Sequence, residues 1–205
     1  MHRYRLALVA GMSVSLAACG INSIPTAEEN AKAKWADVEA AFQRRANLIP
    51  NLVETVRGSA ASEQAILTGV TQARADATRV TVSPEQLDDP EAMRRFAEAQ
   101  GRLSSAIIPL QRLQENYPTL QSQQNFSTLM SQLESTENRI NIAIRDYNQA
   151  VQGYNTEIRT FPGVVGARVI YGADPMVPYQ SVTPGAEVAP NVNFGTGTPA
   201  PATGQ

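Results

Sequence analysis

An apolar stripe between residues 126 and 161 limits the folds that this chain can adopt. Its members recur almost throughout at alternating steps of three and four, and three more residues widen it: Phe126, Leu129, Leu133, Thr136, Ile140, Ala143, Tyr147, Ala150, Tyr154 and Phe161, with Ile144, Val151 and Ile158. Such spacing places side chains on one helix face, and about five successive heptads are typical of left-handed helix bundles and coiled coils. At about 1.5 Å per residue, a helix over residues 122–160 would be roughly 55–60 Å long. The sequence therefore predicts an elongated bundle.

Three further helices are expected before this one, because Ala, Gln, Glu, Leu and Arg dominate the region that begins at residue 26. Thr26 can cap the first helix, which would end near residue 46. Pro50 lacks a backbone donor and clashes with the preceding turn. A second helix, capped at Asn47 and running from about residue 48 to residue 80, is therefore predicted. One continuous helix kinked at Pro50 is the alternative that the sequence leaves open.

The third helix is predicted to begin between residues 84 and 90. Ser83-Pro84-Glu85-Gln86 has the form of a capping box with proline at the first helical position, and Asp89-Pro90 offers a second start. The helix should end near Asn116, because the residue before a proline disfavours helical backbone and Tyr117 precedes Pro118. Pro109 lies inside it and should kink it.

The composition changes abruptly after about residue 163. Residues 171–205 contain six prolines, five glycines and only two charged residues. Such a segment cannot bury enough apolar surface to offset the entropy lost on ordering. Residues 166–205 are therefore predicted to be mostly disordered, although Val164 to Tyr171 could dock as a short extended piece.

The N-terminus resembles the signal of bacterial lipoproteins. Basic residues precede an apolar run from Leu6 to Leu16, which is too short for a membrane span, and Leu16-Ala17-Ala18-Cys19 follows. The resemblance implies cleavage after Ala18, a lipid on the sulfur of Cys19 and acylation, including palmitate, of the new N-terminus. Several acyl chains give stable anchoring. An ordinary cleaved signal with a stray cysteine is the alternative.

The residues that most often perform catalysis are absent from the predicted mature chain. The only histidine, His2, lies in the signal, and Cys19 is the only cysteine. Ser-His-Asp and Cys-His sites and ordinary zinc sites are therefore excluded, and no nucleotide-binding fingerprint occurs. The mature chain has 15 basic and 19 acidic residues, which argues against nucleic acid as a partner. No metal is expected, and no cofactor apart from the lipid on Cys19.

Carboxylates and paired polar residues remain as candidate sites. Glu54, Glu134 and Glu137 could form a catalytic pair or an oxygen-only metal site, but pairing with arginines such as Arg139, Arg145 or Arg44-Arg45 is the favoured interpretation. Tyr147-Asn148 and Tyr154-Asn155 recur seven residues apart on one helix face. They could form a recognition stripe for a helix or a peptide. The favoured alternative is that their rings pack in the seam while their polar groups find partners across the bundle.

Three blocks of sequence carry a family resemblance. They are Arg44-Arg45-Ala46-Asn47-Leu48-Ile49-Pro50-Asn51-Leu52-Val53-Glu54, then Glu115-Asn116-Tyr117-Pro118 with Asn125-Phe126, then Thr136-Glu137-Asn138-Arg139-Ile140 with Tyr147-Asn148, Tyr154-Asn155 and Phe161-Pro162. In this order the blocks resemble the LemA family of bacterial envelope proteins. Asn47 departs from the family's usual aspartate but can still cap a helix. The proline-rich tail after about residue 171 is expected to lie outside the family pattern. The resemblance implies an up-and-down four-helix bundle, supplies no catalytic residues and hints at scaffolding, because some relatives are associated with magnetosome membranes.

The predicted organisation is a signal peptide over residues 1–18, a lipidated tether over 19–25, a bundle over 26–165 and a mostly disordered tail over 166–205. The predicted fold class is all-α, an elongated antiparallel four-helix bundle. We expect a non-enzymatic envelope lipoprotein that acts as an interaction or scaffold protein, with self-association as the alternative and a carboxylate enzyme or metal binder less favoured. Its expected partners are the membrane and an unknown envelope protein or a second copy, without nucleotide. If the host has two membranes, we expect the outer one, facing the periplasm.

Overall fold

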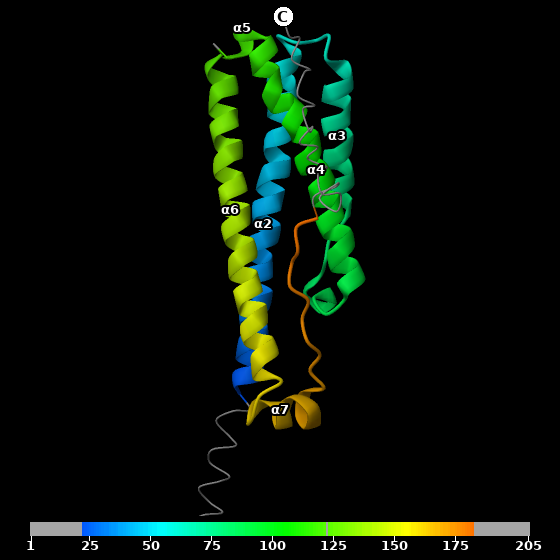
Figure 1. Ribbon diagram of the computed structural model, residues 1–205, viewed down its shortest axis with the longest axis vertical. Helices are drawn as coiled ribbons and strands as arrows, with labels where there is room; N and C mark the ends of the chain where they lie inside the picture. Colours follow the sequence, from blue (N-terminus) through cyan, green and yellow to red (C-terminus); the bar gives the residue numbers. More distant parts are fainter. Residues whose placement is uncertain (1–21, 122, 183–205) are drawn as a thin grey trace, which may run out of the picture.

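A computed structural model describes residues 22–121 and 123–182 of this chain. Its elements are α2 (Ser23–Arg57), α3 (Gln64–Arg79), the 3₁₀ turn η1 (Pro84–Gln86), α4 (Pro90–Asn116), α5 (Pro118–Gln121), α6 (Gln124–Glu157), α7 (Gly163–Gly166) and the π-helical turn η2 (Ala167–Tyr171). Four long antiparallel helices form an elongated bundle, in which α2 lies beside α6, and α3 beside α4 (Figure 1). The predicted all-α fold is therefore confirmed. The predicted signal peptide and Cys19 lie outside the described residues.

Helix α2 continues through Pro50, so the alternative of one continuous helix is correct and the predicted restart at Asn47 is wrong. The proline is exposed, whereas Ile49 and Leu52, on either side of it, are buried in the core. A lost backbone donor on the solvent side costs less than exposing these side chains would.

The predicted helix over residues 48–80 is divided by a turn over residues 58–63. This turn reverses the chain, so that Leu67, Val70 and Ala77 of α3 pack against the upper part of α2. A single rod over residues 48–80 would leave both apolar faces without a partner. Burial of these faces therefore determines where the chain turns.

Both predicted starts of the third helix are used. Ser83 and Gln86 form the capping box of η1, and the carboxylate of Asp89 accepts a hydrogen bond of 2.8 Å from the backbone N–H of Glu91 at the start of α4. Helix α4 runs through Pro109 and ends at Asn116, as expected from the Tyr117-Pro118 pair. The indole N–H of Trp35 donates to the carbonyl of Val82 at 2.9 Å, which ties the loop before α4 to α2.

The core consists of a lower cluster around Trp35 and an upper cluster around Leu103 and Leu110. The ring of Trp35 lies 5.0 Å from that of Tyr147 and 5.3 Å from that of Phe96, so it joins α2, α6 and α4. Nearly all of the predicted stripe on α6 is buried. Leu129 and Ile144 are half-buried, and Phe161, which lies beyond the end of the helix at Glu157, is 85% exposed.

The predicted disorder is wrong for residues 166–182. Residues 163–171 form the helical turns α7 and η2 across the base of the bundle rather than an extended piece. Residues 173–182, here called the strap, then run back up the bundle in extended form (Figure 1, orange). Met176 and Tyr179 of the strap are buried in the lower core cluster. Residues 183–205 lie outside the described residues.

None of the helices in the described part of the chain has the length and hydropathy that crossing a bilayer requires.

Candidate functional site

The strap is held by four side chains of α6, Tyr147, Asn148, Tyr154 and Asn155, here called the Tyr-Asn ladder. The phenol of Tyr147 donates to the carbonyl of Val177 at 2.9 Å, and that of Tyr154 donates to the carbonyl of Asp174 at 3.2 Å. Both tyrosine rings are buried in the core at the same time. Of the two interpretations of the Tyr-Asn repeat, the one with the tyrosine rings packed in the core is correct. The hydroxyl groups of the tyrosines, however, bind an extended segment of the chain itself.

Each of the two asparagines binds the backbone N–H and the backbone carbonyl of one strap residue. Asn148 Nδ2 donates to the carbonyl of Tyr179 at 2.9 Å, while its Oδ1 accepts from the backbone N–H of Tyr179 at 2.8 Å. Asn155 makes the same pair of hydrogen bonds to Met176, at 2.8 and 2.9 Å. The backbone N–H of Val177 donates in turn to the carbonyl of Leu87 at 2.8 Å. The strap is therefore bound as an extended peptide is bound at a sheet edge, with helix side chains in the place of a neighbouring strand.

The spacing of the ladder matches the spacing of an extended chain. Seven helical residues rise about 10.5 Å, and three extended residues span about 10 Å. A heptad step on α6, from Asn148 to Asn155, therefore corresponds to three residues on the strap, from Tyr179 back to Met176. The hydrogen bonds involve only the backbone of the strap, whereas its side chains Met176 and Tyr179, three residues apart, pack in the core.

A third asparagine, Asn141, lies seven residues before Asn148. It is exposed, and no hydrogen bond joins it to another residue of the described chain. The next step of three on the strap leads to Val182, and both residues line a cavity of about 220 Å³ between α4 and α6. The ladder thus has a third position that the described strap does not use.

Burial keeps the phenols of this site protonated. It raises the pKa of Tyr147 well above the usual range, and it raises that of Tyr154, to which Glu28 and Asp174 also contribute. Burial likewise raises the pKa of Tyr179 to about 12, with Arg45 opposing and Glu137 adding to the shift. The two ladder phenols therefore remain hydrogen-bond donors at neutral pH.

Arg45 connects three helices at the inner wall of the same cavity. Its guanidinium is 1% exposed and donates from Nη1 to Ser104 Oγ at 2.7 Å and to Glu137 Oε1 at 3.2 Å. Nη2 donates to the side chain and the carbonyl of Gln100 at 2.8 and 3.2 Å. The amide of Gln100 also donates to the carbonyl of Ala77, which brings in α3. The Nε atom is buried without a hydrogen-bond partner.

Two of the acidic residues nominated from the sequence pair with arginines. Glu137 pairs with Arg45, as expected for structural pairing, and Glu54 pairs with Arg57 at 2.6 Å. Among the described residues, no three histidine, cysteine or acidic side chains gather as metal ligands would.

The family-motif residues take several separate positions. The Tyr117 phenol donates to Glu63 at 2.8 Å and ties two loops at the upper end, Pro118 begins α5, and Phe126 is buried while Asn125 is exposed. Three of the family-motif residues line a hollow between α2 and α6: Arg44, Asn138 and Arg139. Asn47 accepts from Gln43, Asn51 is exposed, and Phe161-Pro162 precede α7.

Sequence reasoning missed Gln100, Ser104 and the strap itself. The heptad repeat of asparagines at 141, 148 and 155, together with the apolar pair Met176 and Tyr179, is the signal that could have indicated the strap. Gln100 and Ser104 carry no comparable signal.

Comparison with known proteins gives a family and three relatives. The model of the LemA family matches residues 34–194, so the family pattern extends through the strap, contrary to the expectation that it stops near residue 171. Magnetosome proteins MamQ 1 and MamQ 2 of Paramagnetospirillum magneticum are each 30% identical over 157 residues, and MamQ of Magnetospirillum gryphiswaldense is 29% identical. The match covers 69% of this chain but only 58% of the length of each relative.

Proposed function

The chain belongs to the LemA family, and from this we propose that it is a lipid-anchored, non-catalytic interaction protein of the bacterial envelope. Its binding site is the groove between α4 and α6 that the strap occupies in part. Its partner is an extended segment of another envelope protein. The Tyr-Asn ladder is the observation that carries this proposal.

A ladder that binds peptide groups does not depend on the identity of most side chains. Asn148 and Asn155 each satisfy one N–H and one C=O of the strap. Any extended segment with two apolar residues three positions apart offers the same groups. Asn141 and the cavity beside it extend the site beyond Val182, so that a longer segment would make contacts that the described strap does not make.

In this proposal, cleavage after Ala18 and a lipid on Cys19 determine where the protein is located. It would hold the protein at a membrane, on the periplasmic face of the outer membrane where the host has two. The MamQ relatives are named as magnetosome proteins, which supports a location at a membrane. The pairing of Glu54 with Arg57 and of Glu137 with Arg45 gives a carboxylate enzyme no support.

Photocrosslinking in living cells tests this proposal. A benzophenone amino acid replaces Ile108, which lines the cavity and is 45% exposed, or the matched control Ile142, which is 49% exposed on the other face of α6. We expect one dominant adduct with a different envelope protein from position 108 and none from position 142. Asn141→Ala should remove that adduct while leaving the strap in place. Identical adducts from both positions, or adducts only with the same chain, would reject the partner.

Self-association is the second candidate, favoured by the way the strap is attached. The strap follows Gly172, which has a φ of 56°, so a change at this one residue could redirect the strap into the groove of a second copy. This candidate predicts dimers in detergent whose population rises with concentration and falls in Asn148→Ala. A monomer at all concentrations would remove it.

A further inference from the structure

The base of the bundle carries most of the exposed large apolar side chains. Seven such residues are exposed among those described, and five of them lie in the segment that turns beneath the bundle: Phe161, Val165, Val169, Ile170 and Tyr171, with Val169 78% exposed. The other two, Ile108 and Ile142, stand apart on the long helices. Isolated apolar residues are common on protein surfaces, whereas a cluster at one end marks an interaction site.

The packing of α7 and η2 reverses the usual pattern of a surface helix. The residues that face the bundle are small, namely Gly163, Gly166 and Ala167, all of them buried. A Cβ atom on Gly163 would lie 2.4 Å from the carbonyl oxygen of Glu157, so only glycine permits this close approach. Because small residues make the inner contact, the large apolar residues are directed outward and contribute little to the core.

The chain enters the bundle at this same end. Helix α2 begins at Ser23, beside α7 (Figure 1). The Ser23 hydroxyl donates to the carboxylate of Glu157. Only four residue steps separate Ser23 from Cys19, which allows at most about 14 Å of extended chain. A lipid on Cys19, which is part of the proposed function, would therefore hold the base of the bundle against the bilayer.

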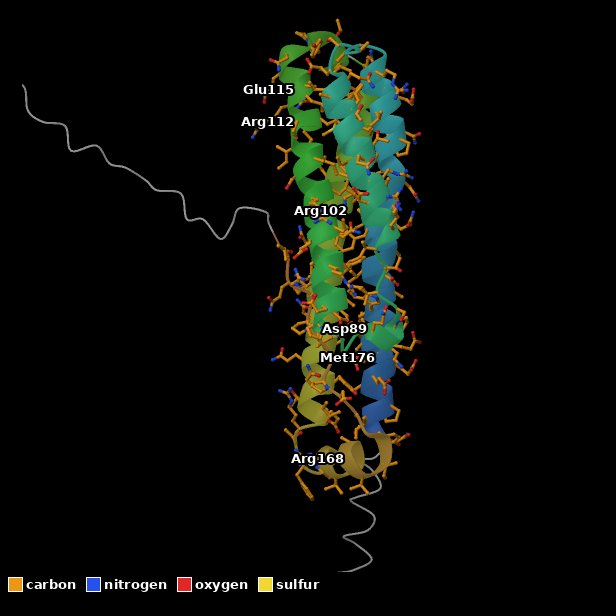
Figure 2. The ribbon with its side chains drawn as sticks, turned by 90° about the vertical axis from the view of Figure 1, so that its right-hand side faces the viewer. Asp89, Arg102, Arg112, Glu115, Arg168 and Met176 are labelled. Carbon is orange, nitrogen blue, oxygen red and sulfur yellow. The ribbon has the colours of Figure 1, made fainter. Side chains whose placement is uncertain are left out.

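The charge of the segment suits an anionic lipid surface. Residues 158–172 contain two exposed arginines, Arg159 and Arg168, and no acidic residue. Figure 2 shows Arg168 at the base of the bundle, below Met176. Arginine side chains can reach phosphate headgroups while neighbouring apolar residues lie deeper, and tyrosine is enriched at this depth.

We propose that the α7–η2 end is a second membrane-contact site, whose apolar side chains enter the interfacial region of the bilayer. The bundle then stands end-on on the membrane, with α5 farthest from it. The strap groove faces sideways, with its third ladder position directed away from the lipid surface. A partner segment would approach along the side of the bundle.

Fluorescence quenching in vesicles tests this contact with the full-length protein purified from membranes. Val169→Trp is compared with Ile142→Trp, after the emission of the buried Trp35 is subtracted using the unsubstituted protein. The vesicles contain phosphatidylethanolamine and phosphatidylglycerol, with bromine on the acyl chains. We expect Val169→Trp to show a blue shift and to lose most of its added emission, and Ile142→Trp to show neither.

Equal quenching of both variants would mean that the bundle lies flat, and no quenching of Val169→Trp would mean that its base does not enter the bilayer. Either result overturns the proposal. Mass spectrometry of the same samples reads the lipid on Cys19 separately. If the protein carries the lipid but Val169→Trp is not quenched, the membrane contact is rejected and the lipid anchor stands. If Val169→Trp is quenched in protein without the lipid, the anchor is rejected and the contact stands. Thermal unfolding of the two variants checks that both are folded.

Discussion

Asn148 holds Tyr179 by both of its backbone groups, across 31 residues of sequence. The side-chain NH₂ of Asn148 donates to the carbonyl of Tyr179, and the side-chain oxygen of Asn148 accepts from the backbone N–H of Tyr179. Asn155 does the same for Met176. Two helix side chains thereby provide the hydrogen bonds that an adjacent β-strand would provide, and they fix a segment whose Met176 and Tyr179 side chains enter the core.

Asn148→Ala should release the strap locally without unfolding the bundle. The change removes two hydrogen bonds, worth about 0.5–1.5 kcal/mol each, from a segment that is otherwise held by its other hydrogen bonds and by the burial of Met176 and Tyr179. We expect much faster amide hydrogen exchange at Met176, Val177 and Tyr179, and little change within α2. Asn141→Ala is the matched control, because Asn141 makes no hydrogen bond to the described strap. Unchanged exchange in Asn148→Ala would mean that side-chain packing alone holds the strap.

Arg45→Met should destabilise the bundle by about 1–3 kcal/mol, because it leaves the buried Gln100 side chain and carbonyl without their hydrogen-bond donor. The guanidinium binds Gln100, Ser104 and Glu137 together. Arg45→Lys should recover little of this loss, since a single ammonium cannot span the three partners. Urea denaturation measures the effect. Arg44→Ala, at an exposed neighbouring position, should stay within about 0.5 kcal/mol of the unsubstituted protein.

The sequence predicts those parts of this fold that depend on local pattern. The stripe on α6 and the end of α4 at Asn116 both follow from spacing or from proline chemistry within a few residues. Pro50 leads to a wrong helix boundary because its cost, a lost backbone hydrogen bond, is local. The burial of α2 that outweighs this cost involves Leu67 and Val70 on another helix. Arg45 and Glu137 lie 92 residues apart, so the sequence alone leaves this pair as one of several possible ion pairs.

The strap was not predictable from its own composition, because its order depends on side chains 20 to 31 residues away. Asn148 and Asn155 of α6 make hydrogen bonds to its backbone. A prediction of disorder from composition considers only the residues of the segment and therefore misses these partners. The ladder residues were identified from their repeat, but nothing in that repeat specified which segment they would bind.

Alkaline pH should destabilise the fold through its buried phenols. Burial raises the pKa of Tyr179 to about 12, whereas an unfolded tyrosine ionises near pH 10. The unfolded state therefore loses its proton first, and the stabilisation is complete below about pH 10 and disappears as the pH rises toward about 12. For Tyr179 this amounts to about 2–3 kcal/mol.

Thermal unfolding measured across this range provides the test. Tyr179→Phe keeps the ring against Phe42 and Phe96 but removes the ionisable group, so it should reduce the alkaline loss of stability. Tyr147, whose pKa is also raised, should account for part of the loss that remains. An unchanged pH profile in Tyr179→Phe would assign the effect to other groups.

Two glycines, Gly153 and Gly163, should respond to alanine in opposite directions. At Gly163 the new methyl group would lie 2.4 Å from the backbone carbonyl of Glu157, so α7 must move away from the base of the bundle. Gly153 lies in an exposed part of α6 with nothing within 4 Å of the new methyl group. Gly153→Ala should therefore raise the free energy of unfolding by about 0.5–1 kcal/mol, because alanine favours the helix and restricts the unfolded chain. Gly163→Ala should lower it, and should speed hydrogen exchange at Val164 and Val165. A stabilising effect at both positions would show that the base of the bundle is held less tightly than the contact between Gly163 and Glu157 implies.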